Sequence, residues 1–180
     1  MDTITLGISL YRLEGDCDEP DPAISSHRTE GELLEILDRM NDIWAPAGIR
    51  LEAKTVSTIK LPKEMLTKVT WGDVRVLLQE LGGSVEPPGP GLINGFFSRS
   101  LGGPNGISFP NSRIFMVADE PSVFDRRVSS HEVGHILGLP HTSIDPHRLL
   151  FSGTNGMSLT DNEITIARMV ASELLESSRE

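Results

Sequence analysis

The sequence predicts a single domain of mixed α/β class, with a mixed sheet and helices in the first two thirds of the chain and one closing helix at its end. Segments rich in β-branched and apolar residues alternate along the chain with segments whose apolar residues recur at helical spacing. The 180 residues suffice for one domain with a hydrophobic core, whereas two full domains would be a tight fit. The 38% of hydrophobic and 23% of charged residues are ordinary for a soluble globular protein.

The N-terminal part of the chain supplies two strands and one long helix. Ile4 to Arg12 alternate apolar side chains onto one face, as a strand does. After an acidic loop, Thr29 and Glu32 form a capping box for a helix that should stop near Ala45, because a proline and a glycine follow. The stretch from Ile49 to Leu61 predicts a second strand.

The middle of the chain is more interrupted. Thr70 with Asp73 indicates a helix start, and this helix should run to Leu81. The glycine- and proline-rich stretch 82–91 predicts a surface loop. Three short strands are then expected, at Leu92–Ser98, Gly106–Phe109 and Arg113–Ala118.

Two further helices complete the predicted fold. Ser122 with Asp125 can cap a helix that ends at Gly138. A capping box formed by Thr160 and Glu163 begins the final helix.

The overall charge limits the choice of partners. The formal net charge of −10 disfavours nucleic acid and an anionic membrane surface, because both repel an acidic protein. No stretch approaches the roughly 18 apolar residues that span a membrane. The N-terminus lacks the pattern of a signal peptide, and the single cysteine, Cys17, cannot form an internal disulfide. A cytoplasmic location is therefore favoured, with a mature secreted form as the alternative.

One segment carries recognisable chemistry. Ser130 to Thr142 reads SHEVGHILGLPHT and contains the pattern H-E-x-x-H-x-x-G-x-x-H. His131 and His135 are four residues apart on a helix and so lie on one face, where they can bind one ion. Gly138 permits the left-handed turn that ends the helix and reverses the chain. The reversal returns His141 as a third ligand.

The ligand set predicts a catalytic zinc and a hydrolase. Three protein ligands leave a fourth position open for water, which is typical of catalytic and not structural zinc. Glu132 follows the first ligand directly, so its carboxylate can reach the bound water and not the ion. Zinc lowers the pKa of its water from about 15.7 to near 7, and Glu132 can accept the water proton during attack on a carbonyl. These roles predict a zinc-dependent endopeptidase that acts on a peptide or protein.

The motif resembles the zinc-binding signature of the metzincin metallopeptidases, and the chain resembles a minimal, matrixin-like catalytic domain of that clan. The resemblance assigns the roles of zinc ligand to His131, His135 and His141, and that of general base to Glu132. It implies a metzincin-like zincin fold: a twisted, mostly parallel sheet with an antiparallel edge strand, a backing helix, the zinc-binding helix and a small C-terminal helical part. The catalytic domain would span 1–180, with an N-terminal subdomain at 1–138 and a C-terminal subdomain at 139–180.

The resemblance also implies a substrate strand and a methionine turn beneath the metal. Metzincins bind an extended peptide along an edge strand, which here implies Gly106, Ile107 and Ser108; an ordinary buried strand is the alternative. The methionine of the family is replaced by Leu150, whose volume is similar, or is supplied by Met157 from a longer loop.

Other interpretations stay open at this point. A zinc-bearing binding or regulatory module without turnover is one, although the intact Glu132 argues against it. A hydrolase of the H-E-x-x-H type that acts on a modified peptide is another, although His141 departs from the cysteine ligand of peptide deformylases. A different divalent metal could occupy the same site. A calcium ion could bind the acidic loop, but no EF-hand spacing supports it among Asp16, Asp18, Glu19 and Asp21.

Overall fold

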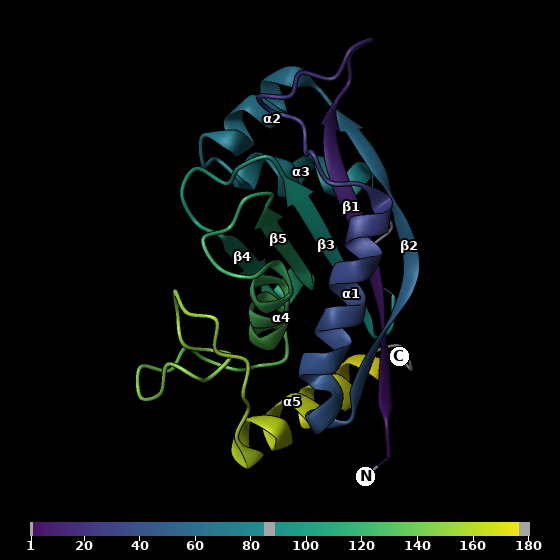
Figure 1. Ribbon diagram of the computed structural model, residues 1–180. Helices are drawn as coiled ribbons and strands as arrows, with labels where there is room; N and C mark the ends of the chain where they lie inside the picture. Colours follow the sequence, from purple (N-terminus) through teal and green to yellow (C-terminus); the bar gives the residue numbers. More distant parts are fainter. Residues whose placement is uncertain (1, 85–88, 177–180) are drawn as a thin grey trace.

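A twisted five-stranded sheet in the order β2-β1-β3-β5-β4 forms the frame of the molecule in the computed structural model (Figure 1). The structure describes residues 2–84 and 89–176. β1 pairs in parallel with β2 and with β3, β3 pairs in parallel with β5, and β4 lies antiparallel to β5 at one edge. The strands are β1 (Ile4–Gly15), β2 (Ile49–Leu61), β3 (Leu92–Ser98), β4 (Gly106–Phe109) and β5 (Ile114–Ala118).

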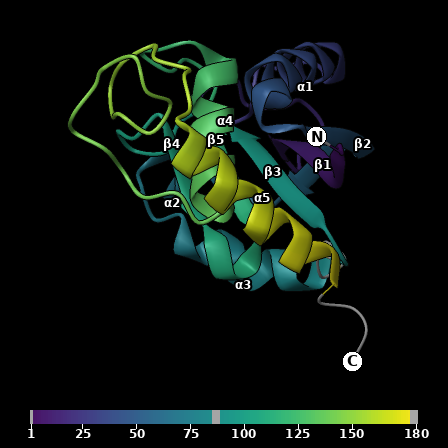
Figure 2. The same ribbon diagram turned by 90° about the horizontal axis from the view of Figure 1, so that it is seen from below.

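Helices cover both faces of this sheet. Figure 2 shows α1 and α4 on one side of the sheet, α2 and α3 on the other, and α5 across one end. The bounds are α1 (Glu30–Trp44), α2 (Lys63–Thr70), α3 (Arg75–Ser84), α4 (Asp125–Ile136) and α5 (Asp161–Glu176), with short 3-10 helices at Ala45–Ala47 and Pro110–Ser112. Among the described residues, none of the helices is both long and apolar enough to cross a membrane.

Alternating side chains of the strands divide the interior into two cores. Leu6, Ile8 and Leu10 of β1 and Phe97 of β3 are buried with apolar residues of α1, α4 and α5. Phe96, the neighbour of Phe97, points to the opposite face and is buried with residues of α2 and α3. This alternation confirms the predicted face of the first strand, and the mixed sheet confirms the predicted fold class.

The prediction of one helix starting at Thr70 and Asp73 was wrong. Two helices lie here, and Thr70 is the last residue of the first of them. The Oγ1 hydroxyl of Thr70 donates to the carbonyl of Leu66 at 2.5 Å, so it is engaged within α2 and does not cap the next helix. Gly72, with a φ of +103°, turns the chain before α3 begins at Arg75.

Three element boundaries also differ from the prediction. β1 continues beyond Arg12 to Gly15, because it stays in register with β2 over that length. α3 runs past Leu81 to Ser84, and residues 85–88 of the expected surface loop lie outside the described residues. β5 begins at Ile114, because Arg113 has a left-handed φ of +51°.

Both predicted capping boxes are present. Thr29 caps α1, and Glu32 accepts a hydrogen bond from the Thr29 backbone in return. Thr160 and Glu163 make the same reciprocal pair at the start of α5.

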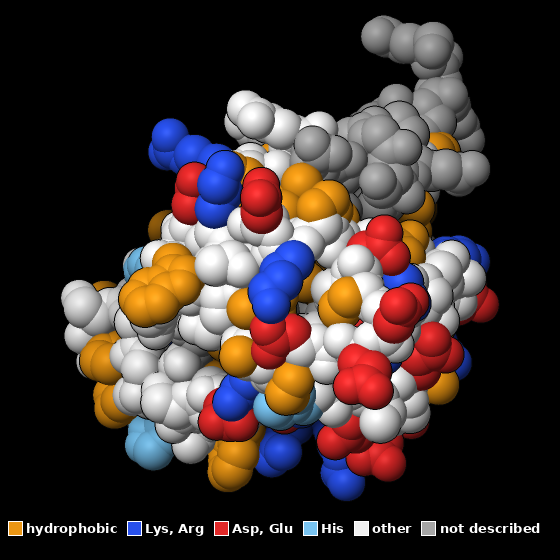
Figure 3. Space-filling view, turned by 90° about the horizontal axis from the view of Figure 1, so that it is seen from above, with side chains coloured by type: hydrophobic (Ala, Val, Ile, Leu, Met, Phe, Trp, Pro, Cys, Tyr) orange, Lys and Arg blue, Asp and Glu red, His pale blue; other side chains and the backbone are white. Residues whose placement is uncertain are grey.

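On the face shown in Figure 3, Lys and Arg side chains are scattered among Asp and Glu.

Candidate metal centre

Helix α4 carries the motif, and side chains from two loops form hydrogen bonds with the residues just before its first turn. The predicted cap at Ser122 was wrong: Phe124 occupies the N-cap position, and no side chain caps it. Ser122 instead exchanges two hydrogen bonds with the side chain of Asn105, at 2.9 and 2.8 Å. The Phe124 N–H donates to Oδ1 of Asn155 at 2.8 Å. The helix start is therefore tied to the loop before β4 and to the loop before α5.

The three predicted ligands meet at one point. His131 and His135 lie one turn apart on α4, and their Nε2 atoms are 3.1 Å apart. The Nε2 atom of His141 lies 3.0 Å from each of them. Within the described part of the chain, this is the only group of three or more His, Cys, Asp or Glu residues whose ligand atoms converge within 4.8 Å.

A tight helix end returns the chain to the histidine cluster. Gly138 has a φ of +81°, and its N–H donates to the carbonyl of His135. The N–H of Leu139 donates to the carbonyl of Gly134, which completes the two-bond arrangement of a Schellman motif. A residue with a Cβ would be strained at this φ, so glycine sets the reversal that brings His141 back.

Backbone carbonyls fix the orientation of two of the ligands. Nδ1 of His131 donates to the carbonyl oxygen of Leu149 at 2.7 Å, and Nδ1 of His135 donates to that of Leu139 at 2.8 Å. Because a carbonyl can only accept, the proton of each neutral ring is on Nδ1, and each Nε2 presents its lone pair to the centre.

These nitrogens fit a divalent cation such as zinc. Lone pairs that face one another at 3.0–3.1 Å repel unless a cation lies between them, and the separations allow one ion to contact all three at the usual Zn–N distance of about 2.0–2.1 Å. Burial lowers the pKa of His131 to about 4 and also lowers the pKa of His135. Both rings are therefore neutral near pH 7, as metal ligands must be.

Glu132 lies in the same pocket as the histidines and is itself 7% exposed. Burial raises the pKa of its carboxyl to about 7, against the opposing effects of a hydrogen bond from the Ser108 side chain and of the positive charge on Arg127. A carboxyl group with a pKa near 7 can both take up and release a proton at neutral pH.

The strand predicted to bind substrate borders this pocket. Gly106, Ile107 and Ser108 of β4 line it together with the three histidines, and its volume is about 380 Å³. β4 is the edge strand, and β5 is its one partner strand among the described residues. At Gly106 an added Cβ would lie 2.8 Å from Oε1 of Glu132, so glycine lets the carboxylate lie against the strand.

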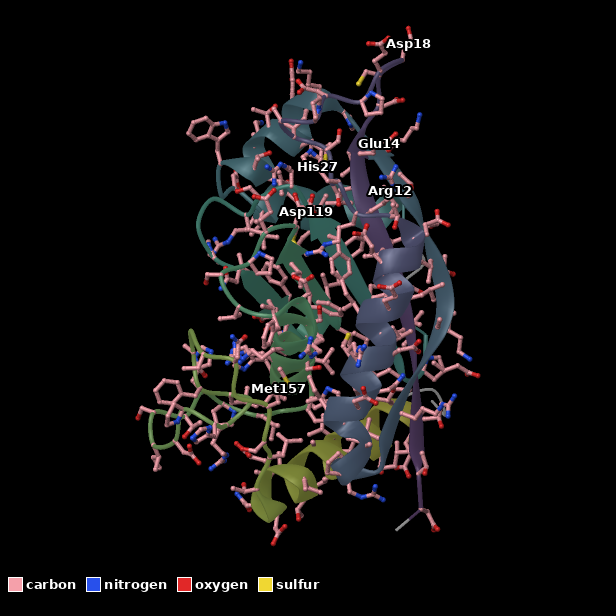
Figure 4. The ribbon with its side chains drawn as sticks, viewed as in Figure 1. Arg12, Glu14, Asp18, His27, Asp119 and Met157 are labelled. Atoms are coloured by element: carbon pink, nitrogen blue, oxygen red, sulfur yellow. The ribbon has the colours of Figure 1, made fainter. Side chains whose placement is uncertain are left out.

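Leu150 lies beneath the motif helix. It is fully buried, and its Cδ atoms are 3.3 and 3.4 Å from the position that a Cβ on Gly134 would take, between the two helical ligands. Met157 is half-buried against the same core and lies beneath α4 in the view of Figure 4. The described packing therefore brings Leu150 directly against the helix that carries the ligands.

Several pocket residues escaped the sequence analysis. Arg127, Asn105 and Gly153 all line the pocket. Arg127 could have been found, because it precedes His131 by four residues and must share its helix face. Nothing in the sequence links Asn105 to the pocket, since its side-chain partner is 17 residues away.

The acidic loop does not form a comparable cluster. Asp18 points away from the fold at one end of the molecule (Figure 4). Asp21 pairs with Lys63 at 3.0 Å, and this contact lowers the pKa of the Asp21 carboxyl.

Figure 4 shows His27 and Asp119 together near the end of β5. The Asp119 carboxylate accepts hydrogen bonds there from the Ser26 hydroxyl and the His27 backbone N–H.

No protein-family model and no curated protein matches the chain in sequence. Solved structures do match its fold. They include a chain from a chaperone–substrate complex, at 14% identity and a TM-score of 0.58, with 99% of this chain and 36% of that chain covered. Metalloproteinase-II from Bacteroides fragilis matches at 11% identity and a TM-score of 0.53, over 94% of this chain and 54% of that chain.

Archaemetzincin from Archaeoglobus fulgidus, solved in complex with malonate, matches at 11% identity and a TM-score of 0.52, over 89% of this chain and 99% of that chain. The present chain thus spans about a third and about half of the first two matched chains, and nearly all of the third. It has the mixed α/β fold of these metallopeptidase neighbours, and its three histidines form a site that could bind a metal.

Proposed function

We propose that the chain is a zinc-dependent endopeptidase of metzincin type. One observation carries the proposal: three histidine Nε2 atoms converge within 3.1 Å, beside a buried glutamate and an edge strand that line the same pocket. The metallopeptidase fold of the neighbours supports a peptidase-like function.

His131, His135 and His141 would hold the zinc ion. When bound, zinc would polarise the substrate carbonyl and lower the pKa of water to near 7. The carbonyl oxygens of Leu149 and Leu139 keep two of the ligands in the required tautomer and orientation.

Glu132 would act as the general base and then as the general acid. Its carboxylate accepts a proton from the attacking water and returns that proton to the leaving amine. The raised pKa of about 7 suits both steps at neutral pH. The packing of Glu132 against Gly106 keeps the carboxylate beside the strand along which a peptide would lie.

Gly106, Ile107 and Ser108 would bind the substrate. An extended peptide can add to the edge of β4 that β5 leaves free, and its main chain would then pass the histidines. Leu150, packed under α4, would take the place of the family's methionine.

A cleavage assay tests the proposal. Zinc-loaded protein is incubated with a diverse peptide library, and the cleavage products are identified by mass spectrometry. We expect cuts from the wild type, and cutting slower by a factor on the order of 10² to 10⁴ from Glu132→Gln at equal zinc content. Absence of cuts by folded, zinc-loaded wild type would instead favour a binding module without turnover, or a hydrolase of a modified peptide.

A further inference from the structure

Arg127 is a buried cation in the wall of the candidate substrate pocket. It lies on α4 one turn before His131, is only 4% exposed, and lines the pocket with the metal ligands. Glu132, already assigned to proton transfer, is the other Asp, Glu, Lys or Arg residue that lines this pocket.

The hydrogen bonds of the Arg127 guanidinium leave part of it available. A guanidinium has five N–H donors. Nη2 donates to the carbonyl oxygens of Leu149 and Phe151, and Nε donates to that of Gly156 at 3.4 Å. In the described parts of the chain no group accepts from Nη1.

The charge of Arg127 is not neutralised by an ion pair. No Asp or Glu of the described residues lies within salt-bridge distance of its guanidinium. A buried guanidinium without a carboxylate partner is costly, and three carbonyl oxygens offset the cost only in part. A carboxylate that entered the pocket would complete both its charge and its hydrogen bonding.

We infer that Arg127 makes the pocket selective for a carboxylate carried by the substrate residue next to the cleaved bond. This inference rests on the proposed peptidase function. The carboxylate has two sources: the side chain of an internal Glu or Asp, or the free C-terminus of a peptide cut near its end. Recognition is by a charge-assisted hydrogen bond from Nη1, because Nε and Nη2 already donate to backbone carbonyls.

Wild-type protein gives the first test, because it requires no variant to fold. A peptide found to be cut is resynthesised with Glu, Gln or Leu at the residue that enters the pocket, each with a free and with an amidated C-terminus. For an acidic side chain we expect kcat/KM for Glu to exceed that for Gln by about tenfold or more, whatever the C-terminus. For C-terminal recognition, amidation lowers kcat/KM and the side chain does not matter.

The second test removes the charge. Arg127→Met should bring the ratio of kcat/KM for the acidic over the neutral peptide close to one. Arg126→Met is the matched control, because the neighbouring guanidinium stacks 4.5 Å from the Phe124 ring and faces a different hollow. It should keep the wild-type preference. Zinc content and circular dichroism are recorded for each variant.

Binding supplies a readout apart from turnover. Zinc-loaded Glu132→Gln should bind the preferred carboxylate peptide about tenfold more tightly than its neutral counterpart by fluorescence anisotropy, and Arg127→Met in that background should abolish the difference. Cleavage with no preference for a carboxylate from either source would overturn the assignment of Arg127 and leave the peptidase intact. No cleavage of any peptide would overturn the proposed function, and this inference with it.

Discussion

Nδ1 of His131 and Nη2 of Arg127 both donate to the carbonyl oxygen of Leu149, at 2.7 and 2.8 Å. One peptide group therefore orients a proposed metal ligand and anchors the arginine of the pocket wall. The next residue, Leu150, packs under the helix that carries both donors. The loop after the motif thus supports the candidate metal site, although none of its residues beyond His141 belongs to the histidine cluster.

Loss of one ligand should abolish the stabilisation that zinc gives. We expect added zinc to raise the Tm of metal-free wild type and to leave the Tm of His141→Ala unchanged, because ions that bind only the folded state stabilise it. His147→Ala is the control, since this exposed histidine of the same loop lies outside the ligand cluster. Differential scanning fluorimetry measures both, and a full zinc response in His141→Ala would contradict the assigned ligand set.

The close approach of Glu132 to β4 predicts a strong effect of one methyl group. In Gly106→Ala the new Cβ would lie 2.7 Å from Cγ1 of Val128 and 2.8 Å from Oε1 of Glu132. We expect peptide hydrolysis to fall by at least about tenfold while zinc is retained, because a misplaced base loses proton-transfer efficiency. Gly31→Ala in α1 meets nothing closer than 3.8 Å and should leave activity unchanged. Equal rates for the two variants would show that Glu132 does not need this space.

Truncation of Leu150 and of Met157 to alanine should show which of the two side chains fills the position of the family's methionine. Leu150→Ala opens a cavity under the ligand helix and should lower the free energy of unfolding by about 2–5 kcal/mol, whereas Leu150→Met should cost less than about 1.5 kcal/mol. Met157→Ala should cost less than Leu150→Ala, because Met157 is only half-buried. Urea unfolding gives these values, and the reverse order would assign the turn to Met157.

Two buried groups of the site should give opposite pH dependences of stability in metal-free protein. The pKa of His131 is lowered from 6.5 to about 4, so the unfolded state binds more protons there, and stability is lost as the pH falls through this range. The pKa of Glu132 is raised from 4.5 to about 7, so the folded state binds more protons there, and stability is lost as the pH rises through that range.

Glu132→Gln removes one of these two effects. We expect its free energy of unfolding, relative to wild type, to rise by about 3 kcal/mol between pH 4.5 and pH 7, which follows from a pKa shift of that size. Urea unfolding of the metal-free proteins at several pH values measures the difference. A difference that stays constant with pH would mean that Glu132 has an ordinary pKa in the folded protein.

Sequence reasoning was most accurate where local rules decide the outcome. The alternation of Leu6, Ile8 and Leu10, the capping boxes at Thr29 and Thr160, and the spacing of the motif all reflect short-range geometry. The convergence of the histidines was predictable for the same reason, since His131 and His135 share a helix face and Gly138 ends that helix nearby.

Sequence reasoning was least accurate where hydrogen-bond partners are distant in sequence. Ser122 looked like a helix cap, but it pairs with Asn105 across a fold that the local pattern does not reveal. Thr70 looked like a cap as well, and its hydroxyl bonds back into its own helix. The environment of Arg127 depends on carbonyl groups 22 to 29 residues away, and no local rule places them.

Zinc titration of the metal-free protein, with peptide hydrolysis recorded at each step, tests the central claim most directly. We expect the rate for wild type to rise in proportion to zinc and to saturate at one equivalent per chain. Glu132→Gln should bind the same single equivalent and stay slower by a factor on the order of 10² to 10⁴. Hydrolysis without metal, or a Glu132→Gln variant as fast as wild type, would contradict the account.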